Sequence, residues 1–364
     1  MSQLFAENQV IERNIEHLPS GHVLLVDALP DNALRAFSEA RPDITWHVFT
    51  PFADTYETLS AQTSSIQSLE GVYTGAWLSA NNNKAAPLPQ FNAVIIYYPK
   101  TKQRFEYYTS MVSQLLAEDA DWFVVGEKKG GVKSCDKGLK PYVYASKKLD
   151  AARHCMLFHG VYNNRASEAS LEDWFNTTST QVKTQGASGQ AITVDLQLAS
   201  LPGVFSATKL DAGTDLLLQH IHSLQGRGLD FGCGCGVIAT TLAKAFDVNI
   251  DALDVDALAV ESTRRSFELN GIDGTAIHSN GLGQISKQHQ YDFIVSNPPF
   301  HTGINTDYSI VESFLKGSKA RLKSRYQMWI VANSFLPYQD WFAKFLKSAN
   351  TIVNNKRFSV YHIK

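Results

Sequence analysis

Four consecutive residues, Asn297, Pro298, Pro299 and Phe300, are the strongest candidates for chemistry in this sequence. They follow a short apolar run over 291–296 with the β-branched composition of a buried parallel strand. Two prolines fix two φ angles and stiffen the loop. The carboxamide oxygen of Asn297 and the carbonyl oxygen of Pro298 then form two acceptors beside an aromatic face, which suits a planar group with an exocyclic amine. For this motif alone, an ordinary strand-ending turn is the alternative.

A glycine-rich loop holds the second set of candidates, Asp230, Gly232, Gly234 and Gly236. The loop precedes an apolar helix expected over 237–246, so a ligand could lie on bare backbone at the helix N-terminus. This glycine spacing also fits a dinucleotide-binding loop. Asp230 would repel a pyrophosphate but could accept from an ammonium or from structural amides, and the Asn297 motif has no role in hydride transfer. Together these features favour S-adenosylmethionine, a zwitterion without phosphate.

Two later strand ends complete the expected cofactor site. Asp254 follows Asp230 by about 24 residues at the end of the next expected strand, where its carboxylate can accept from both ribose hydroxyls. Asp256 is expected to cap a helix over 257–269. Asn280 ends the following strand and could bind the adenine amine.

The elements that must position these residues occur twice. In the first half, strands are expected over 22–27, 45–49, 93–99 and 122–126, alternating with helices such as 32–40. The second half repeats their order and spacing, with Asp230 matched to Asp27 and Asn297 to Tyr97. We therefore expect an α/β protein of two tandem doubly wound, Rossmann-like domains related by duplication. Two unrelated α/β domains are the alternative.

The two expected domains are 1–190 and 191–364, and the polar stretch 176–189 is either their linker or the start of a β-ribbon. No glycine follows Asp27, so nothing there permits close approach of a ligand to the backbone. Tyr97-Tyr98-Pro99-Lys100 stands where the second half has its Asn-Pro-Pro-Phe motif. The first domain is therefore predicted to be a degenerate, catalytically inactive copy.

Eleven basic residues crowd the region 100–153 of a chain whose formal net charge is −2. We expect Lys100, Lys128, Lys129 and Lys133 to contact the phosphate backbone of a nucleic acid. A solvated lysine-rich surface is the alternative. The complete group is Lys100, Lys102, Arg104, Lys128, Lys129, Lys133, Lys137, Lys140, Lys147, Lys148 and Arg153.

Composition sets the broad class. The chain has 364 residues, 44% of them hydrophobic, and no apolar run of the roughly 20 residues that a membrane helix needs. The sequence starting at Met1 lacks the pattern of a signal peptide. Four cysteines are too few for a disulfide framework, and Cys233 and Cys235 have no second ligand pair for a metal. We expect a cytoplasmic protein with no metal and no membrane contact.

With these residues in place, the chain resembles the bacterial small-subunit ribosomal RNA guanine-N2 methyltransferases, the RsmC family. The resemblance extends over nearly the whole length, and the segments that carry it are 95–100, 123–127, 201–206, Leu210, Asp211, Gly213, 229–237, 297–300 and 330–338. It implies a pair of class I methyltransferase domains, of which the C-terminal one binds S-adenosylmethionine and the N-terminal one assists folding and RNA binding. The implied substrate is a guanine of 16S rRNA in the assembled small ribosomal subunit, and the implied enzyme is a monomer.

The resemblance also assigns roles. The three loop glycines would seat the methionine part of the cofactor, and a segment over 202–213 would close over it, with Gly213 and Thr214 as contacts. Phe300 would stack on a guanine that has left its own stack, while Asn297 and Pro298 accept from its N2 amine. Departures are confined to 323–325, where many methyltransferases have glycines.

Four other functions use some of the same features. Adenine-N6 and protein-glutamine methyltransferases share the Asn-Pro-Pro-aromatic motif, and a sister enzyme methylates large-subunit rRNA. A non-catalytic RNA-binding factor would explain the lysines but not the cofactor loop. His301 is adjacent to the motif, and we expect it to face solvent rather than act as a base.

Overall fold

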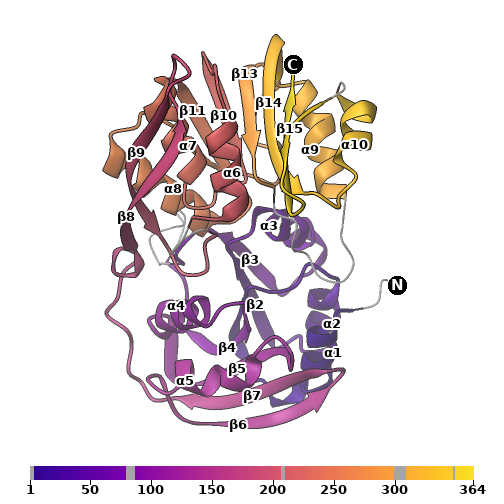
Figure 1. Ribbon diagram of the computed structural model, residues 1–364. Helices are drawn as coiled ribbons and strands as arrows, with labels where there is room; N and C mark the ends of the chain where they lie inside the picture. The colour runs from indigo at the N-terminus through magenta and orange to yellow at the C-terminus, as the bar shows by residue number, and fades with distance from the viewer. Residues whose placement is uncertain (1–3, 79–86, 206–209, 299–308, 347–348) are drawn as a thin grey trace. The chain divides into compact units, whose positions relative to one another are not determined.

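The computed structural model describes residues 4–78, 87–205, 210–298, 309–346 and 349–364. The chain divides into two compact units, Met1–Trp174 and Phe175–Lys364 (Figure 1). The division lies before the expected boundary at residue 190, because strands β8 (Asn176–Gln185) and β9 (Ala191–Ser200) pair as an antiparallel ribbon within the second unit. This ribbon packs on the helices of the second unit, so the polar stretch is a β-ribbon and not a flexible linker.

The first unit is built on a seven-stranded sheet of order β3-β2-β1-β4-β5-β7-β6. Its first five strands are parallel, and β7 pairs antiparallel with both β5 and β6. The strands are β1 (Gly21–Val26), β2 (Ile44–Thr50), β3 (Leu69–Thr74), β4 (Phe91–Tyr97), β5 (Leu116–Glu127), β6 (Val143–Ala152) and β7 (Cys155–Tyr162). The helices are α1 (Ala6–Arg13), α2 (Ala33–Ala40), α3 (Ala53–Ser60), α4 (Lys102–Ser113) and α5 (Cys135–Leu139).

The second sheet has the order β12-β11-β10-β13-β14-β16-β15. Its strands are β10 (Arg227–Phe231), β11 (Asn249–Asp254), β12 (Ala276–His278), β13 (Tyr291–Ser296), β14 (Leu322–Asn333), β15 (Asn350–Asn354) and β16 (Phe358–Ile363). Its helices are α6 (Ala212–His220), α7 (Val237–Phe246), α8 (Ala257–Asn270), α9 (Ser309–Lys319) and α10 (Tyr338–Phe345). The second order is the first with every strand number raised by nine, which confirms the predicted repeat.

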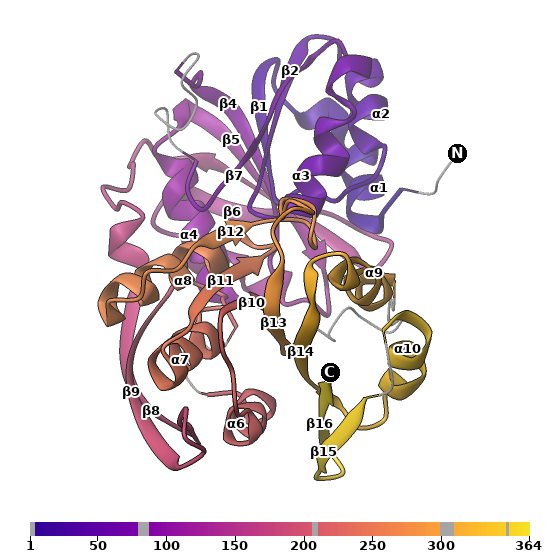
Figure 2. The same ribbon diagram turned by 90° about the horizontal axis from the view of Figure 1, so that it is seen from above.

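Helices cover both faces of each sheet (Figure 2). In the second unit, α9 and α10 contribute Phe314, Leu315 and Phe342 to a core on one face, and α6, α7 and α8 lie on the other. In the first unit, a core formed by α1 and α2 holds Val10 and Phe37 against β1 and β2. Strands buried on both faces explain the continuous apolar runs of β1, β4, β10 and β13.

One sequence alignment between the copies is corrected by the strand register. Val26 pairs with Phe49 and Ile96, and Phe231 pairs with Leu253 and Ser296, so Val26 and Phe231 are equivalent. Asp27 therefore corresponds to Gly232, with φ of 62° and 78°, and not to Asp230. Asp27 takes the left-handed conformation that the second copy gives to a glycine. The match of Tyr97 with Asn297 agrees with this register.

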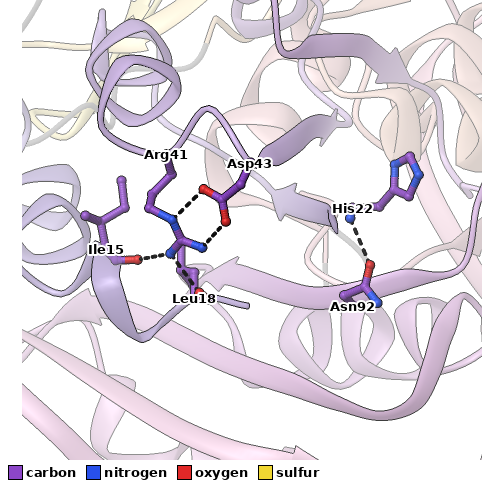
Figure 3. A network of polar contacts seen from close by, with 6 residues as sticks. All are labelled: Ile15, Leu18, His22, Arg41, Asp43 and Asn92. Atoms are coloured by element: carbon purple, nitrogen blue, oxygen red, sulfur yellow. Dashed lines mark hydrogen bonds and ion pairs between the residues drawn. The ribbon is translucent and has the colours of Figure 1, made fainter. Parts of the chain in front are cut away.

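Arg41 connects the segment that follows α1 with the residue that precedes β2 (Figure 3). Its guanidinium donates to the carbonyl oxygens of Ile15 at 3.0 Å and Leu18 at 2.8 Å, and forms a two-pronged pair with Asp43. Ile15 and Leu18 lie between α1 and β1, and Asp43 immediately precedes β2. The Arg41 side chain therefore links the segment after α1 to the start of β2. Bidentate pairing of this kind fixes orientation as well as distance.

Candidate active site

The candidate residues of the second unit gather at the carboxyl ends of the parallel strands of its sheet. The glycine loop follows β10, Asp254 ends β11, and Asn297 follows β13. These three strands are adjacent and parallel, so their carboxyl ends open at the same edge. That edge is where doubly wound sheets bind ligands.

The glycine loop satisfies its own backbone donors. The amides of Gly232 and Cys233 both donate to the Leu253 carbonyl, at 2.9 and 3.0 Å, and the amide of Gly236 donates to Cys233 at 2.9 Å. The three loop glycines have φ of 78°, 56° and 84°, values that other residues adopt with strain. Because these amides are already paired, the loop does not offer the ring of donors that a pyrophosphate requires. This geometry favours a ligand without phosphate.

Asp230 is fully buried below this loop. Its Oδ2 accepts from the Ala239 amide in the first turn of α7 at 3.1 Å, which satisfies one donor of the helix N-terminus. Its Oδ1 has no hydrogen-bond partner within the described ranges. Burial, followed by the charge of Asp254, raises the pKa of Asp230 to about 7. An orphaned buried carboxylate oxygen fits a cationic ligand group such as the ammonium of S-adenosylmethionine.

Asp254 bridges two loops with its two carboxylate oxygens. One accepts from the Gly234 amide and the other from the Asp256 amide, both at 3.0 Å. Burial raises the pKa of Asp254 to about 6, and the charge of Asp256 adds to the effect. A carboxylate has about four acceptor positions, so each oxygen keeps capacity for a ribose hydroxyl. Asp256 caps α8 by accepting from the Leu258 amide at 3.0 Å, as predicted.

Asn297 is held by the start of α6, the helix that precedes β10. Its Nδ2 donates to Asp211 Oδ2 at 3.1 Å and to Thr214 Oγ1 at 2.9 Å. The same Asp211 oxygen accepts from the amides of Gly213 and Thr214, at 2.8 and 3.0 Å, and so caps α6. A carboxylate only accepts, so the amide nitrogen must face it. Both amide donors are thereby occupied, and the carboxamide oxygen is the group left to accept from a substrate.

The sequence analysis named Asp211 as part of the family resemblance and Thr214 as a cofactor contact, but it missed the contact of both residues with Asn297. The signal was present, because Asp-x-x-Thr at a helix start is an N-cap pattern. Their partner, however, lies 86 and 83 residues away along the chain. Thr214 is 3% exposed with its hydroxyl on Asn297, so it positions that amide, and its direct contact with a cofactor stays a prediction.

Other predicted residues differ in how far the structure describes them. Pro298 is buried directly after Asn297, whereas Pro299, Phe300 and His301 lie outside the described residues. Asn280 is exposed beyond β12, and its carbonyl accepts from the Gly283 amide at 3.1 Å, so adenine binding by its side chain stays a prediction.

Cys233 and Cys235 are buried free thiols. Burial raises the pKa of Cys235 to about 12, so its sulfur stays protonated and packs as an apolar group. Thr263 donates its hydroxyl to Cys233 Sγ at 3.2 Å, which ties the glycine loop to α8.

The predicted RNA-contacting side chains of the first unit, Lys100, Lys128, Lys129 and Lys133, are all exposed, and we call them the loop lysines. They follow β4 and β5, whose carboxyl ends share one sheet edge. Tyr98 joins the two loops, because its hydroxyl hydrogen-bonds with Ser134 at 2.9 Å. Arg104 does not belong to this surface: it is 6% exposed and lies 5.5 Å from the Phe52 ring centroid. Lys147 and Lys148 lie on edge strand β6, where lysines also deter strand pairing.

Comparison with known proteins agrees with this arrangement. The family model described as "Methyltransferase small domain N-terminal" matches residues 8–178, and "Methyltransferase small domain" matches residues 195–362. A solved T. thermophilus 16S rRNA N2 methyltransferase, in complex with AdoMet and guanosine, superimposes with a TM-score of 0.78 at 19% identity, covering 98% of this chain and 91% of that one. At 19% identity, this similarity shows that the two proteins share a fold. No helix of the described residues is long and apolar enough to cross a membrane.

Two curated relatives, each named "Ribosomal RNA small subunit methyltransferase C", extend the match over nearly the whole sequence. The protein from Shewanella loihica is 36% identical over 97% of this chain and 97% of its own length. The protein from Acinetobacter baumannii is 38% identical over 91% of each. Such identity over both units, together with the paired family models, places the chain in the ribosomal RNA small subunit methyltransferase C family.

Proposed function

We propose that this protein transfers a methyl group from S-adenosylmethionine to the exocyclic N2 of a guanine in 16S rRNA, as presented by the small ribosomal subunit. The observation that carries the proposal is the fixed carboxamide of Asn297, whose two donors are occupied by Asp211 and Thr214. The family to which the chain belongs supports the substrate class.

The chain's own residues bind and orient. Asp254 would hold the ribose, Asp230 and the glycine loop would receive the methionine part, and the cofactor supplies an electrophilic methyl group when bound. The carboxamide oxygen of Asn297 would accept from the guanine amine and aim its nitrogen. Because the nitrogen lone pair is delocalised into the ring, two fixed acceptors stabilise the positive charge that develops there. Phe300 would stack on the base.

The first unit is proposed to bind RNA through the loop lysines and to support folding. Its exposed lysines follow neighbouring strands and are joined through Tyr98 and Ser134, which presents them as one surface. We infer as well that the enzyme works in the cytoplasm, since the four cysteines are buried free thiols. We also propose that it acts as a monomer. Light scattering of the purified chain tests the oligomeric state.

The defining experiment offers methyl-labelled S-adenosylmethionine together with small subunits, large subunits and deproteinised rRNAs in parallel. Nuclease digestion then identifies the labelled nucleoside. We expect N2-methylguanosine from small subunits. Label from the large subunit would move the target while keeping the chemistry. Absence of label from every RNA, despite tight cofactor binding, would contradict the proposal and direct attention to protein-glutamine methylation.

A matched pair of variants tests the Asn297 geometry. Thr214→Val removes the hydroxyl that accepts from Asn297 and should lower kcat about 10-fold or more. Because Thr214 is also a predicted cofactor contact, kcat is measured at saturating S-adenosylmethionine. Thr240→Val is the control, because Thr240 is also buried but its hydroxyl has no partner within the described ranges. Equal kcat for the two variants would show that the orientation of Asn297 does not limit the reaction.

A further inference from the structure

Two histidines and a glutamate of the first unit converge on strands β1, β2 and β3, whereas the loop lysines follow the carboxyl ends of β4 and β5. His22 is the second residue of β1, His47 the fourth of β2 and Glu70 the second of β3, on three adjacent parallel strands. Their ligand atoms, two ring nitrogens and one carboxylate oxygen, lie within 4.8 Å of one another. None of these residues takes part in the proposed methyl transfer.

The strand register explains why all three side chains share one face. His47 pairs with Leu24, two residues after His22, so alternation places both histidines on the same side of the sheet. In the register that pairs Gly71 with His47, a regular strand would point Glu70 to the other side of the sheet. However, Trp46 pairs with Leu69 and His47 with Gly71, which leaves Glu70 as the extra residue of a β-bulge. A bulge re-aims a side chain, and here the carboxylate turns toward the histidines.

The distances match those of a single ion with three protein ligands. His22 Nδ1 is 3.0 Å from His47 Nε2, and Glu70 Oε2 is 3.9 Å from the first nitrogen and 3.6 Å from the second. Zinc binds nitrogen and oxygen at about 2.0–2.2 Å, so tetrahedral ligands are about 3.3 Å apart. The three observed separations bracket that value.

A hydrogen bond between the two rings leaves this cluster incomplete. Two neutral imidazoles whose nitrogens face each other share one proton, which satisfies one lone pair. Glu70 then faces the same nitrogens as a third acceptor, at distances too long for a hydrogen bond. A divalent cation accepts electron pairs from all three atoms at once. Imidazole and carboxylate together are ligands of zinc-type ions rather than of magnesium or calcium.

The surroundings hold the ligands and leave one side open. His47 is fully buried, and its second nitrogen lies 3.3 Å from the Tyr73 hydroxyl, the type of outer contact that orients a metal-binding histidine. Gly71 makes room for that hydroxyl, since a Cβ there would lie 2.6 Å from it. The backbone amide of His22 donates to Asn92 at 2.9 Å while its ring points away (Figure 3). The His22 and Glu70 side chains are 37% and 56% exposed, so solvent reaches a fourth position.

We propose that His22, His47 and Glu70 form a binding site for one divalent transition-metal ion of the zinc class, which ties together β1, β2 and β3. The site has three protein ligands and a fourth position for water. It is independent of methyl transfer, so it stands or falls separately from the proposed function.

Zinc binding to the full-length chain tests this site. Chelator-treated protein is loaded with Zn²⁺, its metal content is measured by elemental mass spectrometry, and affinity is obtained by competition with a chromophoric chelator. His22→Ala and Glu70→Gln each remove an exposed ligand without altering the core. His17→Ala is the matched control, because His17 is an exposed histidine of the same unit outside the cluster. Tyr73→Phe tests the outer contact.

We expect one zinc per chain in the wild type and in His17→Ala, and at least ~10-fold weaker binding in both ligand variants, since loss of an outer contact alone lowers affinity ~10–100-fold. Tyr73→Phe should lose affinity within that outer-contact range. Cobalt substitution should give the visible bands of tetrahedral coordination in the wild type and in His17→Ala, and these bands should be lost in His22→Ala and Glu70→Gln. A wild type that retains no zinc, or ligand variants that bind as tightly as His17→Ala, would overturn the proposal.

Discussion

The buried carboxylate of Asp230 is predicted to destabilise the ligand-free fold while serving the cofactor. Raising its pKa from the ordinary 3.8 to about 7 makes ionisation unfavourable by about 4 kcal/mol, at 1.36 kcal/mol per factor of ten. The folded state binds this proton up to about pH 7, and the unfolded chain releases it near pH 3.8. Stability therefore falls as pH rises through that window and levels off above it.

Asp230→Asn removes this ionisation but keeps an acceptor for the Ala239 amide. The new amide donor is buried without a partner and costs about 1–3 kcal/mol, which offsets part of the stability gained by removing the ionisation of Asp230. About 1–3 kcal/mol of net stabilisation remains at pH 8, or roughly 5 °C in Tm for a unit of this size. At pH 5 the carboxyl of the folded state is protonated and only about 1.6 kcal/mol of the destabilisation remains, because the unfolded chain releases its proton near pH 3.8. The cost of the unpartnered amide cancels this remainder, so the gain should vanish.

Thermal unfolding of the ligand-free protein at pH 5 and pH 8, with calorimetric titration of S-adenosylmethionine, measures both consequences. Asp230→Asn should bind the cofactor at least ~10-fold more weakly, because the charge-assisted contact with its ammonium is lost. Asp273→Asn is the control, since Asp273 is exposed and should change neither Tm nor affinity. If Asp230→Asn were less stable at pH 8 and bound the cofactor normally, the carboxylate would be structural and this reasoning would be wrong.

Three further variants separate binding from chemistry. Asn297→Ala should lower kcat at least ~10²-fold with cofactor affinity intact by calorimetry, since the α6 cap survives without this side chain. With a pKa of about 6, Asp254 should lose cofactor affinity as pH falls below that value, and Asp254→Asn should bind weakly at every pH tested. Changing Lys128, Lys129 and Lys133 together to Ala should weaken RNA binding and reduce its salt slope by up to ~2–3, whereas a double change of the two β6 lysines should not. An unchanged slope would remove the loop lysines from the RNA interface.

Local patterns predicted much of the second unit. The helix expected over 237–246 is α7, and the cap at Asp256 is present. Both follow from short-range signals, namely a glycine loop before an apolar run and an aspartate before a helix. The shared sheet edge of the candidate residues followed from strand order, because carboxyl ends of parallel strands lie together.

Features that depend on distant partners were missed. The ribbon of β8 and β9 was not separable from a linker, since its polar residues acquire structure by pairing and packing within the second unit. Arg104 was counted with exposed cations because nothing local shows that Phe52 covers it. The position of Glu70 beside His47 depends on a bulge in the pairing of β2 with β3, a feature without a signal in either segment.

The same long-range bridge exists in both units but ends in different chemistry. Tyr97, the equivalent of Asn297, is 5% exposed and donates its hydroxyl to Asn8 of α1, the helix before β1. Asn297 likewise reaches the start of α6, the helix before β10. The phenol of Tyr97 uses its single hydrogen-bond donor in this contact and is buried in the core. The carboxamide of Asn297 uses two donors and retains its oxygen as an acceptor. Replacing Tyr97 alone would not restore a site, because Asp27 stands where the second copy has Gly232 and accepts from Tyr108 at 3.3 Å. Divergence of the copies thus converted a ligand-facing edge into packed core, while the exposed positions of that edge carry the loop lysines.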